Sequence, residues 1–379
     1  MRQIRTSPRI NSQTQHRNLL LDATKGLAII LVVFGHEVET AVTFGHQYSE
    51  SGWTYVSELW YSWVAIHHFH MALFIFISGY LAYGKLNSKW LQRRTLQLLL
   101  PYFAWMVILY YCSRFWFTGL SRGFPTSGGL VHSLLLSTWT QTTSGLWFLP
   151  LLLMLCVIAY VTKGKPVAML LISGIAYAVS QLPSPSIFGH TIPPTAWFSR
   201  IAWFMPLYVL GYLVSQYREK LSKLSFVKWG ALIAFPVVFI LAGSLNWSIP
   251  RYSWPAYSFF AEGHLIFGFY GFIMALLGIG MAIAVVEIIC KMARIQRILA
   301  YIGGITLGIY CASNIARNIG LGNGLGWVIT ATLVALVSSI VLIRILQRFR
   351  ITDYLLLGGA QKLVPRESWI ATAPHKEGR

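Results

Sequence analysis

Charged side chains are scarce in this chain, and acidic ones are the scarcest. Only 11% of its 379 residues are Asp, Glu, Lys or Arg, and Asp and Glu together number 11 against 30 Lys and Arg. Soluble globular domains carry roughly 25% charged residues, so the composition excludes an ordinary soluble domain. No long polar linker interrupts the apolar stretches, which predicts a single polytopic membrane domain.

Cysteine is also rare, and the spacing of the four cysteines excludes two common uses. They lie far apart in apolar stretches, at Cys112, Cys156, Cys290 and Cys311. Because none of them is paired at close spacing, neither a disulfide framework nor a metal site is expected. No bound metal or cofactor is predicted.

Apolar stretches of about 20 residues recur along the chain, as is typical of transmembrane helices. We expect an all-α integral membrane protein. A basic tail (1–18) precedes the membrane domain (19–346), and a polar tail (347–379), helical near 347–363, follows it. The first span is expected to be a retained signal anchor, because no small-residue cleavage motif follows it. The ten predicted spans are 19–38, 63–83, 96–117, 146–162, 166–182, 198–216, 226–245, 265–289, 299–319 and 325–346.

Most of the 30 Lys and Arg residues fall in the N-terminal tail, in alternate connections and in the C-terminal tail. This is the positive-inside pattern. It predicts that both termini are cytoplasmic and that the number of spans is even. The excess positive charge then faces anionic lipid headgroups, so membrane lipids are the expected partners and nucleic acid is not.

Three ionisable residues lie in the first predicted span: Asp22, Lys25 and His36. On a helix, Lys25 and His36 point within about 20° of each other and lie roughly 16 Å apart along the axis. Asp22 lies about 60° from Lys25 and about 40° from His36, so all three follow one stripe. Two interpretations stay open: a self-neutralising Asp22–Lys25 pair, or a polar track that ends in a histidine at the outer side.

The second predicted span carries His67, His68 and His70 in the sequence WVAIHHFHMALFIFISGYLAY. Only His67 and His70 have helical ligand spacing and no carboxylate is close in sequence, so a general base is favoured over a metal site. The small residues of ISGY would let another helix approach closely. Tryptophans, Trp147 among them, fall mainly on the predicted outer side, which suits either an interfacial belt or stacking against a sugar.

These stretches together resemble the membrane acyltransferase-3 family, the polytopic O-acyltransferases of bacterial sugars. RNLLLDATKGLAIILVVFGH (17–36) is similar to the first-span signature, and FHMALFIFISGYL (69–81) resembles the second-span motif of the fucose 4-O-acetylase-like branch, with Ala72 where proline is common. RRTLQLLLPY (93–102) resembles the cytoplasmic two-arginine motif, with Gln97 where the second arginine is expected. LWFLP, YVLGYL and YIGGITLGIY also fit, although Ser313 stands where many members place a histidine.

The resemblance implies a multi-pass enzyme of the bacterial inner membrane. It would transfer an acyl group, most simply acetyl from acetyl-CoA as co-substrate, to a hydroxyl of an extracytoplasmic or lipid-linked sugar. His36 would be the general base and Asp22 would orient or neutralise Lys25. Acyl-CoA would bind Lys25, Arg94 and Arg93.

The sugar acceptor would contact His70, His67, Glu58 or Trp147. Glu37, Glu58 and Glu262 are carboxylates that could orient His36 or bind sugar hydroxyls. Two rival functions stay open: a proton-coupled transporter of a sugar or small metabolite, and an acyltransferase that acts on a lipid or peptide. Against the transporter, the two halves show no internal repeat and no matched pair of broken helices.

Overall fold

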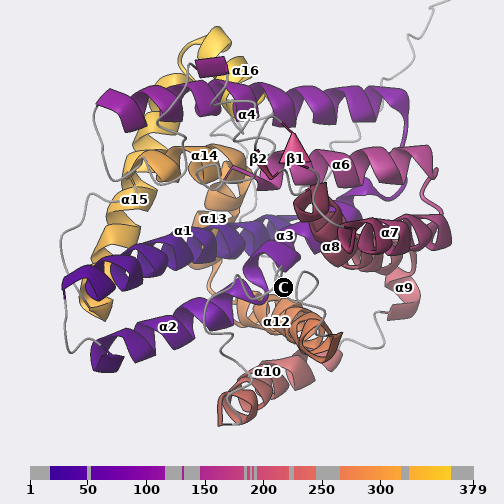
Figure 1. Ribbon diagram of the computed structural model, residues 1–379, viewed down its shortest axis with the longest axis horizontal. Coiled ribbons are helices and arrows are strands. Elements are labelled where there is room, and N and C mark those ends of the chain that lie inside the picture. The colour runs from indigo at the N-terminus through magenta and orange to yellow at the C-terminus, as the bar shows by residue number, and fades with distance from the viewer. Residues whose placement is uncertain are drawn as a thin grey trace, which may run out of the picture.

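The architecture is known from a computed structural model, which describes residues 18–48, 53–115, 130–131, 146–182, 186–187, 190–191, 194–221, 226–244, 265–316 and 324–359. The described part is helical except for one pair of two-residue strands, as the apolar sequence predicts. Figure 1 shows α4 along one edge of the bundle, α10 and α12 at the opposite edge, and α1 between them.

The first half of the chain contributes α1 (Leu19–Tyr48), α2 (Trp53–His67), α3 (His70–Ala82), α4 (Ser88–Phe115), α6 (Phe148–Val161) and α7 (Pro166–Ser180). The strands β1 (Ser186–Ile187) and β2 (His190–Thr191) pair antiparallel. The second half contributes α8 (Pro194–Gln216), α9 (Arg218–Leu221), α10 (Val227–Ser244), α12 (Leu265–Ile289), α13 (Ala293–Gly304), α14 (Thr306–Ala316), α15 (Leu325–Leu346) and α16 (Arg350–Leu357).

Six of the described helical segments are long and apolar enough to cross a membrane, which makes this a multi-pass membrane protein. They are Leu19–Ala41, Tyr61–Ala82, Ser88–Cys112, Trp197–Gln216, Phe269–Ile289 and Leu325–Leu346. The predicted count of ten is not confirmed, because three of the other segments form shorter apolar helices, Phe148–Val161, Pro166–Ser180 and Val227–Ala242. The predicted orientation of the termini also remains a prediction.

Two of the predicted spans are interrupted. The second turns briefly at His68 and Phe69, between α2 and α3. The ninth is bent by 73° at the break between α13 and α14. If that bent pair is one span, the described part has seven spans. The interruptions matter because they redirect the side chains next to them.

Arg93 and Arg94 do not lie in a loop before the third span, as the predicted span boundary placed them. Both belong to the first turns of α4, which already begins at Ser88. Arginine is a good helix former, and its long stem lets the charge reach the membrane surface from within a helix.

Helices cross at four glycines where a side chain would collide with backbone. A Cβ at Gly79 of α3 would meet the carbonyl of Tyr208 on α8, and one at Gly211 would meet the carbonyl of Phe76. The same holds between Gly26 of α1 and Gly303 of α13. The close approach expected at ISGY is therefore present, since small residues let membrane helices pack at short range.

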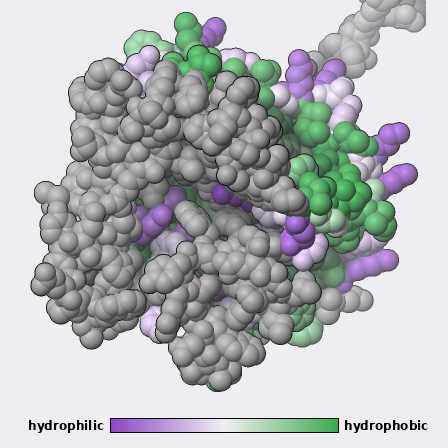
Figure 2. Space-filling view, viewed as in Figure 1, coloured by the Kyte–Doolittle hydropathy of each residue, from purple (hydrophilic) through white to green (hydrophobic). Residues whose placement is uncertain are grey.

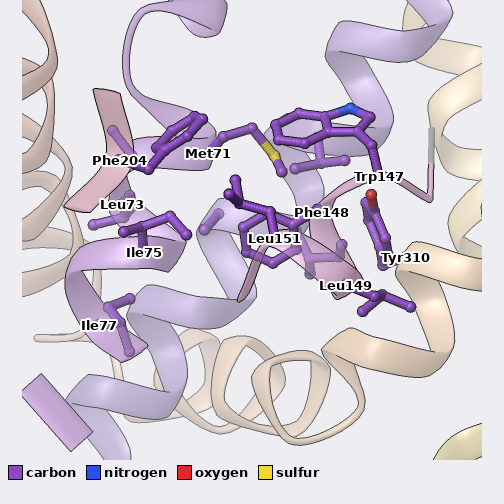
Figure 3. Packing of buried hydrophobic residues seen from close by; sticks show 14 of the residues in the cluster. Met71, Leu73, Ile75, Ile77, Trp147, Phe148, Leu149, Leu151, Phe204 and Tyr310 are labelled. Carbon is purple, nitrogen blue, oxygen red and sulfur yellow. The ribbon is translucent and has the colours of Figure 1, made fainter. Parts of the chain in front are cut away.

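Large apolar side chains from α3, α6, α8 and α14 fill the centre of the bundle (Figure 3). In this view Met71 lies between Phe204 and Trp147. The ring of Phe148 lies 5.8 Å from that of Tyr310, centroid to centroid. This packing joins the two halves of the chain.

The outer surface of several helices is apolar, as a lipid environment requires. On α7, Val167, Leu171 and Ile175 are more than 60% exposed. Figure 2 shows a hydrophobic surface on the right of the molecule, with hydrophilic side chains projecting beside it. The α6–α7 turn, with Lys163 and Lys165, and α9, with Arg218 and Lys220, lie on that side in Figure 1.

The last described helix, α16, lies against α4. The indole nitrogen of Trp105 donates a 2.8 Å hydrogen bond to the carbonyl oxygen of Leu356, and Gly358 packs on the backbone of Gln97. Gly358 has a φ of 74°, which a side chain would strain. Gln97, which stands where the resemblance expects a second arginine, is thus in contact with the end of α16.

We predict that Gly79→Ala destabilises the protein by about 1–3 kcal/mol, because the added methyl group forces α3 away from α8. Gly174→Ala is the matched control, since a Cβ there meets nothing within 4 Å. Alanine is the better helix former, so this control should be neutral or stabilising. Thermal unfolding of both variants in detergent checks the prediction, and equal unfolding temperatures would contradict it.

Candidate functional site

The polar stripe predicted on the first span lies on one uninterrupted helix. α1 runs from Leu19 to Tyr48 without a break, so Lys25 and His36 share a face. The ammonium nitrogen of Lys25 lies 2.5 Å from a carboxylate oxygen of Asp22, and the two side chains are 23% and 11% exposed. This contact is the Asp22–Lys25 pair that the first interpretation predicts.

The half of the stripe that contains Asp22 and Lys25 lies against α13. A Cβ at Gly303 would meet the carbonyl of Asp22, and the buried side chain of Leu299 packs in the same interface. As a whole residue, Asp22 is consequently only 7% exposed. The ion pair is held where helix packing, rather than water, surrounds the carboxylate.

The half of the stripe that contains His36 also holds a partner for it that the sequence reasoning missed. A carboxylate oxygen of Glu39 lies 3.5 Å from Nδ1 of His36. Glu39 stands three residues after His36 on the same helix, a spacing at which side chains meet, and this was the signal that could have found it. Glu37, considered instead, is buried at 6% exposure.

The histidines of the second span come to His36 through another close approach. A Cβ at Gly35 would lie 3.3 Å from a ring carbon of His67. The rings of His67 and His70 are 4.7 Å apart, centroid to centroid, and nearly perpendicular. Both rings lie within electrostatic range of His36. The structure thus brings three predicted site residues, His36, His67 and His70, into one cluster.

The hydrogen bonds of this cluster fix which nitrogen of each ring can act as a base. Nδ1 of His67 lies 2.8 Å from the carbonyl oxygen of Trp63, and Nδ1 of His70 lies 2.8 Å from that of Ile66. A carbonyl only accepts, so each Nδ1 carries the proton. In the neutral rings Nε2 is then the basic nitrogen. A proton on Nδ1 of His36, which faces Glu39, would likewise leave Nε2 of His36 as the basic nitrogen.

The two arginines of α4 differ in their surroundings. Arg93 is exposed, whereas Arg94 is partly buried. Arg94 lies within electrostatic range of Cys156 in α6 and Tyr208 in α8. Of the two arginines, Arg94 is therefore the one that lies near neighbouring helices.

Trp147 is in contact with an arginine. The guanidinium carbon of Arg200 is 4.2 Å from the centroid of the Trp147 ring and 5.8 Å from that of Trp197. Trp147 itself is only 7% exposed. The two aromatic partners give Arg200 a defined position on α8.

Two of the predicted carboxylates lie outside the part of the chain that the structure describes. Glu58 lies on α2, but its side chain is outside the described part, and so is Glu262. Within the described residues, no group of three or more His, Cys, Asp or Glu side chains has a geometry that could hold a metal ion. What the described geometry offers is a cluster suited to proton transfer, a buried ion pair and a partly buried arginine.

Comparison with known proteins decides the family. A family model described as an acyltransferase domain matches residues 18–346. The chain belongs to the acyltransferase-3 family. Its curated relatives include the nodulation protein NolL of Mesorhizobium japonicum, which is 29% identical over 208 residues, 54% of this chain and 49% of that protein.

A second acyltransferase-3 relative is the nodulation protein NolL of Sinorhizobium fredii. It is 32% identical over 117 residues, which cover 28% of this chain and 29% of that protein. The matched region therefore spans about half of one relative and less than a third of the other. No solved structure matches the chain.

We predict that Asp22→Ala destabilises the protein by about 1–3 kcal/mol, because it leaves the charge of Lys25 without its partner inside the bundle. The double variant Asp22→Ala/Lys25→Met should regain part of this loss, since it removes the charge as well. Thermal unfolding in detergent measures both. A double variant less stable than the single one would contradict this account.

Proposed function

We propose that this protein is a membrane-embedded O-acyltransferase that moves an acetyl group from acetyl-CoA to a hydroxyl of an extracytoplasmic or lipid-linked sugar. The observation that carries the proposal is the placement of His36 and Lys25 on one face of α1, eleven residues apart, with a histidine cluster at the outer end. Family membership supports the reaction class. The bacterial inner membrane is the proposed location.

The inner end of α1 is the proposed side of entry for acetyl-CoA. Arginine binds phosphate through forked donors, and Arg94 is the better placed of the two arginines because it is partly buried and lies near α6 and α8. Lys25 lies further along the track. Its charge is balanced by Asp22, so it can approach an anionic or polar part of the donor without a net charge in the bundle.

The outer cluster is the proposed place of reaction. Nε2 of His36 takes the proton of the acceptor hydroxyl while the hydroxyl oxygen attacks the thioester carbonyl carbon. The carbon–sulfur bond then breaks, and the thiolate of CoA takes the proton back from His36. Glu39 is a positioning residue, since its carboxylate beside Nδ1 favours the tautomer with a basic Nε2.

The sugar acceptor is proposed to approach His67 and His70 from the outer side. Their basic Nε2 atoms accept hydrogen bonds from hydroxyl groups. The proposed contacts with Glu58 and Trp147 remain less defined, because Trp147 is buried and paired with Arg200.

We predict that His36→Ala lowers the rate of acetyl transfer by about 10²–10⁴-fold, the usual contribution of a general base. Glu39→Gln should lower kcat by roughly tenfold, a part of that contribution. Both variants should bind acetyl-CoA as the wild type does. Acetyl-CoA turnover by purified protein, with binding measured separately, checks these values. Wild-type turnover by a well-folded His36→Ala protein would contradict the role of His36.

We predict that Arg94→Ala raises the Kd for acetyl-CoA by about 10- to 100-fold, through the loss of a charge-assisted hydrogen bond. Arg93→Ala should change it less than threefold, because Arg93 is exposed. Lys165→Ala, another exposed basic residue, is the matched control. Calorimetric titration of the purified proteins with acetyl-CoA provides the comparison. Equal effects of all three substitutions would point to surface charge alone.

A further inference from the structure

His68 differs from the two histidines beside it. It lies in the short turn between α2 and α3, is 6% exposed, and its Nε2 has no hydrogen-bond partner. His67 and His70 each bond back to a carbonyl four residues earlier. The turn therefore directs His68 away from the cluster that contains its neighbours.

His68 meets a second polar group that also lacks a partner. The hydroxyl of Tyr270, on α12, is buried and makes no hydrogen bond. The rings of His68 and Tyr270 are 5.5 Å apart, centroid to centroid, and perpendicular to each other. These residues come from segments about 200 positions apart in the sequence, and each has a buried polar atom without a hydrogen-bond partner.

Aromatic side chains of α10 lie beside this pair. The ring of Phe239 is 6.4 Å from that of His68, and it is stacked on Phe235 at 6.2 Å with an angle of 2° between the planes. Phe235 in turn contacts Phe69, at 5.4 Å. The pair is thus set against an apolar wall.

Buried polar side chains are nearly always hydrogen-bonded, to the protein or to a bound molecule. Two such groups on rings in contact are available to bond a bound molecule. A neutral imidazole and a phenol each offer a donor and an acceptor, which is the pairing pattern of an alcohol hydroxyl. A sugar ring adds an apolar face of C–H groups that matches an aromatic wall.

We propose that His68 and Tyr270 form a subsite for hydroxyl groups of a neutral sugar, with Phe239 against the ring. The inference deepens the proposed function by naming the residues that select the acceptor class. It rests on that function because His68 adjoins His67, which belongs to the cluster around His36. The alkyl part of an acyl chain would leave both polar atoms unpaired, so a hydrocarbon ligand is disfavoured here.

The test is equilibrium binding of methyl glycosides of fucose, rhamnose, glucose and galactose to the purified full-length protein in detergent, without acyl donor. We expect the wild type to bind at least one glycoside. Tyr270→Phe removes only the hydroxyl and should weaken that binding about 3- to 10-fold, the value of one hydrogen bond. His68→Asn should act in the same direction. Tyr217→Phe, the same change at the exposed end of α8, is the matched control.

Two outcomes would overturn the subsite: a wild type that binds none of the four glycosides, or a Tyr270→Phe protein that binds them as tightly as the wild type. Either would mean that the pair holds only an ordered water. Neither outcome would contradict the proposed acyl transfer, which is measured separately by acetyl-CoA turnover on native membranes. Conversely, glycoside binding that Tyr270→Phe weakens, without any turnover, would refute the enzyme and keep the subsite.

Discussion

The contact between α1 and α13 at Gly26 and Gly303 is the constraint on which the candidate site depends. The absence of side chains there lets the two backbones touch, and close packing of small residues is a main source of attraction between helices in lipid. This contact covers Asp22 and holds its ion pair with Lys25 inside the bundle. Because α1 is one uninterrupted helix, the contact that fixes its N-terminal half also sets the position of His36.

Close contacts at three further glycines complete the arrangement. Gly35 brings His67 against α1, while Gly79 and Gly211 lock α3 onto α8. The histidine cluster is therefore built from backbone approaches rather than from long flexible side chains. Ionisable groups inside a membrane are costly unless paired, and the described site meets this condition with the Asp22–Lys25 pair and with Glu39 next to His36.

Much of this could be predicted from the sequence. The period of the helix alone places Lys25 and His36 on one face, and the residues of ISGY indicate the close contact that Gly79 makes. The turn at His68 could not be predicted, because no proline or glycine marks it. The bend at Ile305 was not predicted either, although Gly303 and Gly304 precede it. Glu39 was missed although its spacing from His36 was visible. The partial burial of Arg94 depends on how α4 packs in the bundle, which only the tertiary fold supplies.

The central claim is that donor and acceptor meet from opposite sides of the membrane along α1. The most direct test supplies radiolabelled, membrane-impermeant acetyl-CoA to inside-out and to right-side-out vesicles that contain the protein and its native glycan. The account predicts labelled glycan in the inside-out vesicles, where the cytoplasmic face meets the added acetyl-CoA. Labelling confined to the right-side-out vesicles would contradict it, because acetyl-CoA would then be used on the same side as the acceptor.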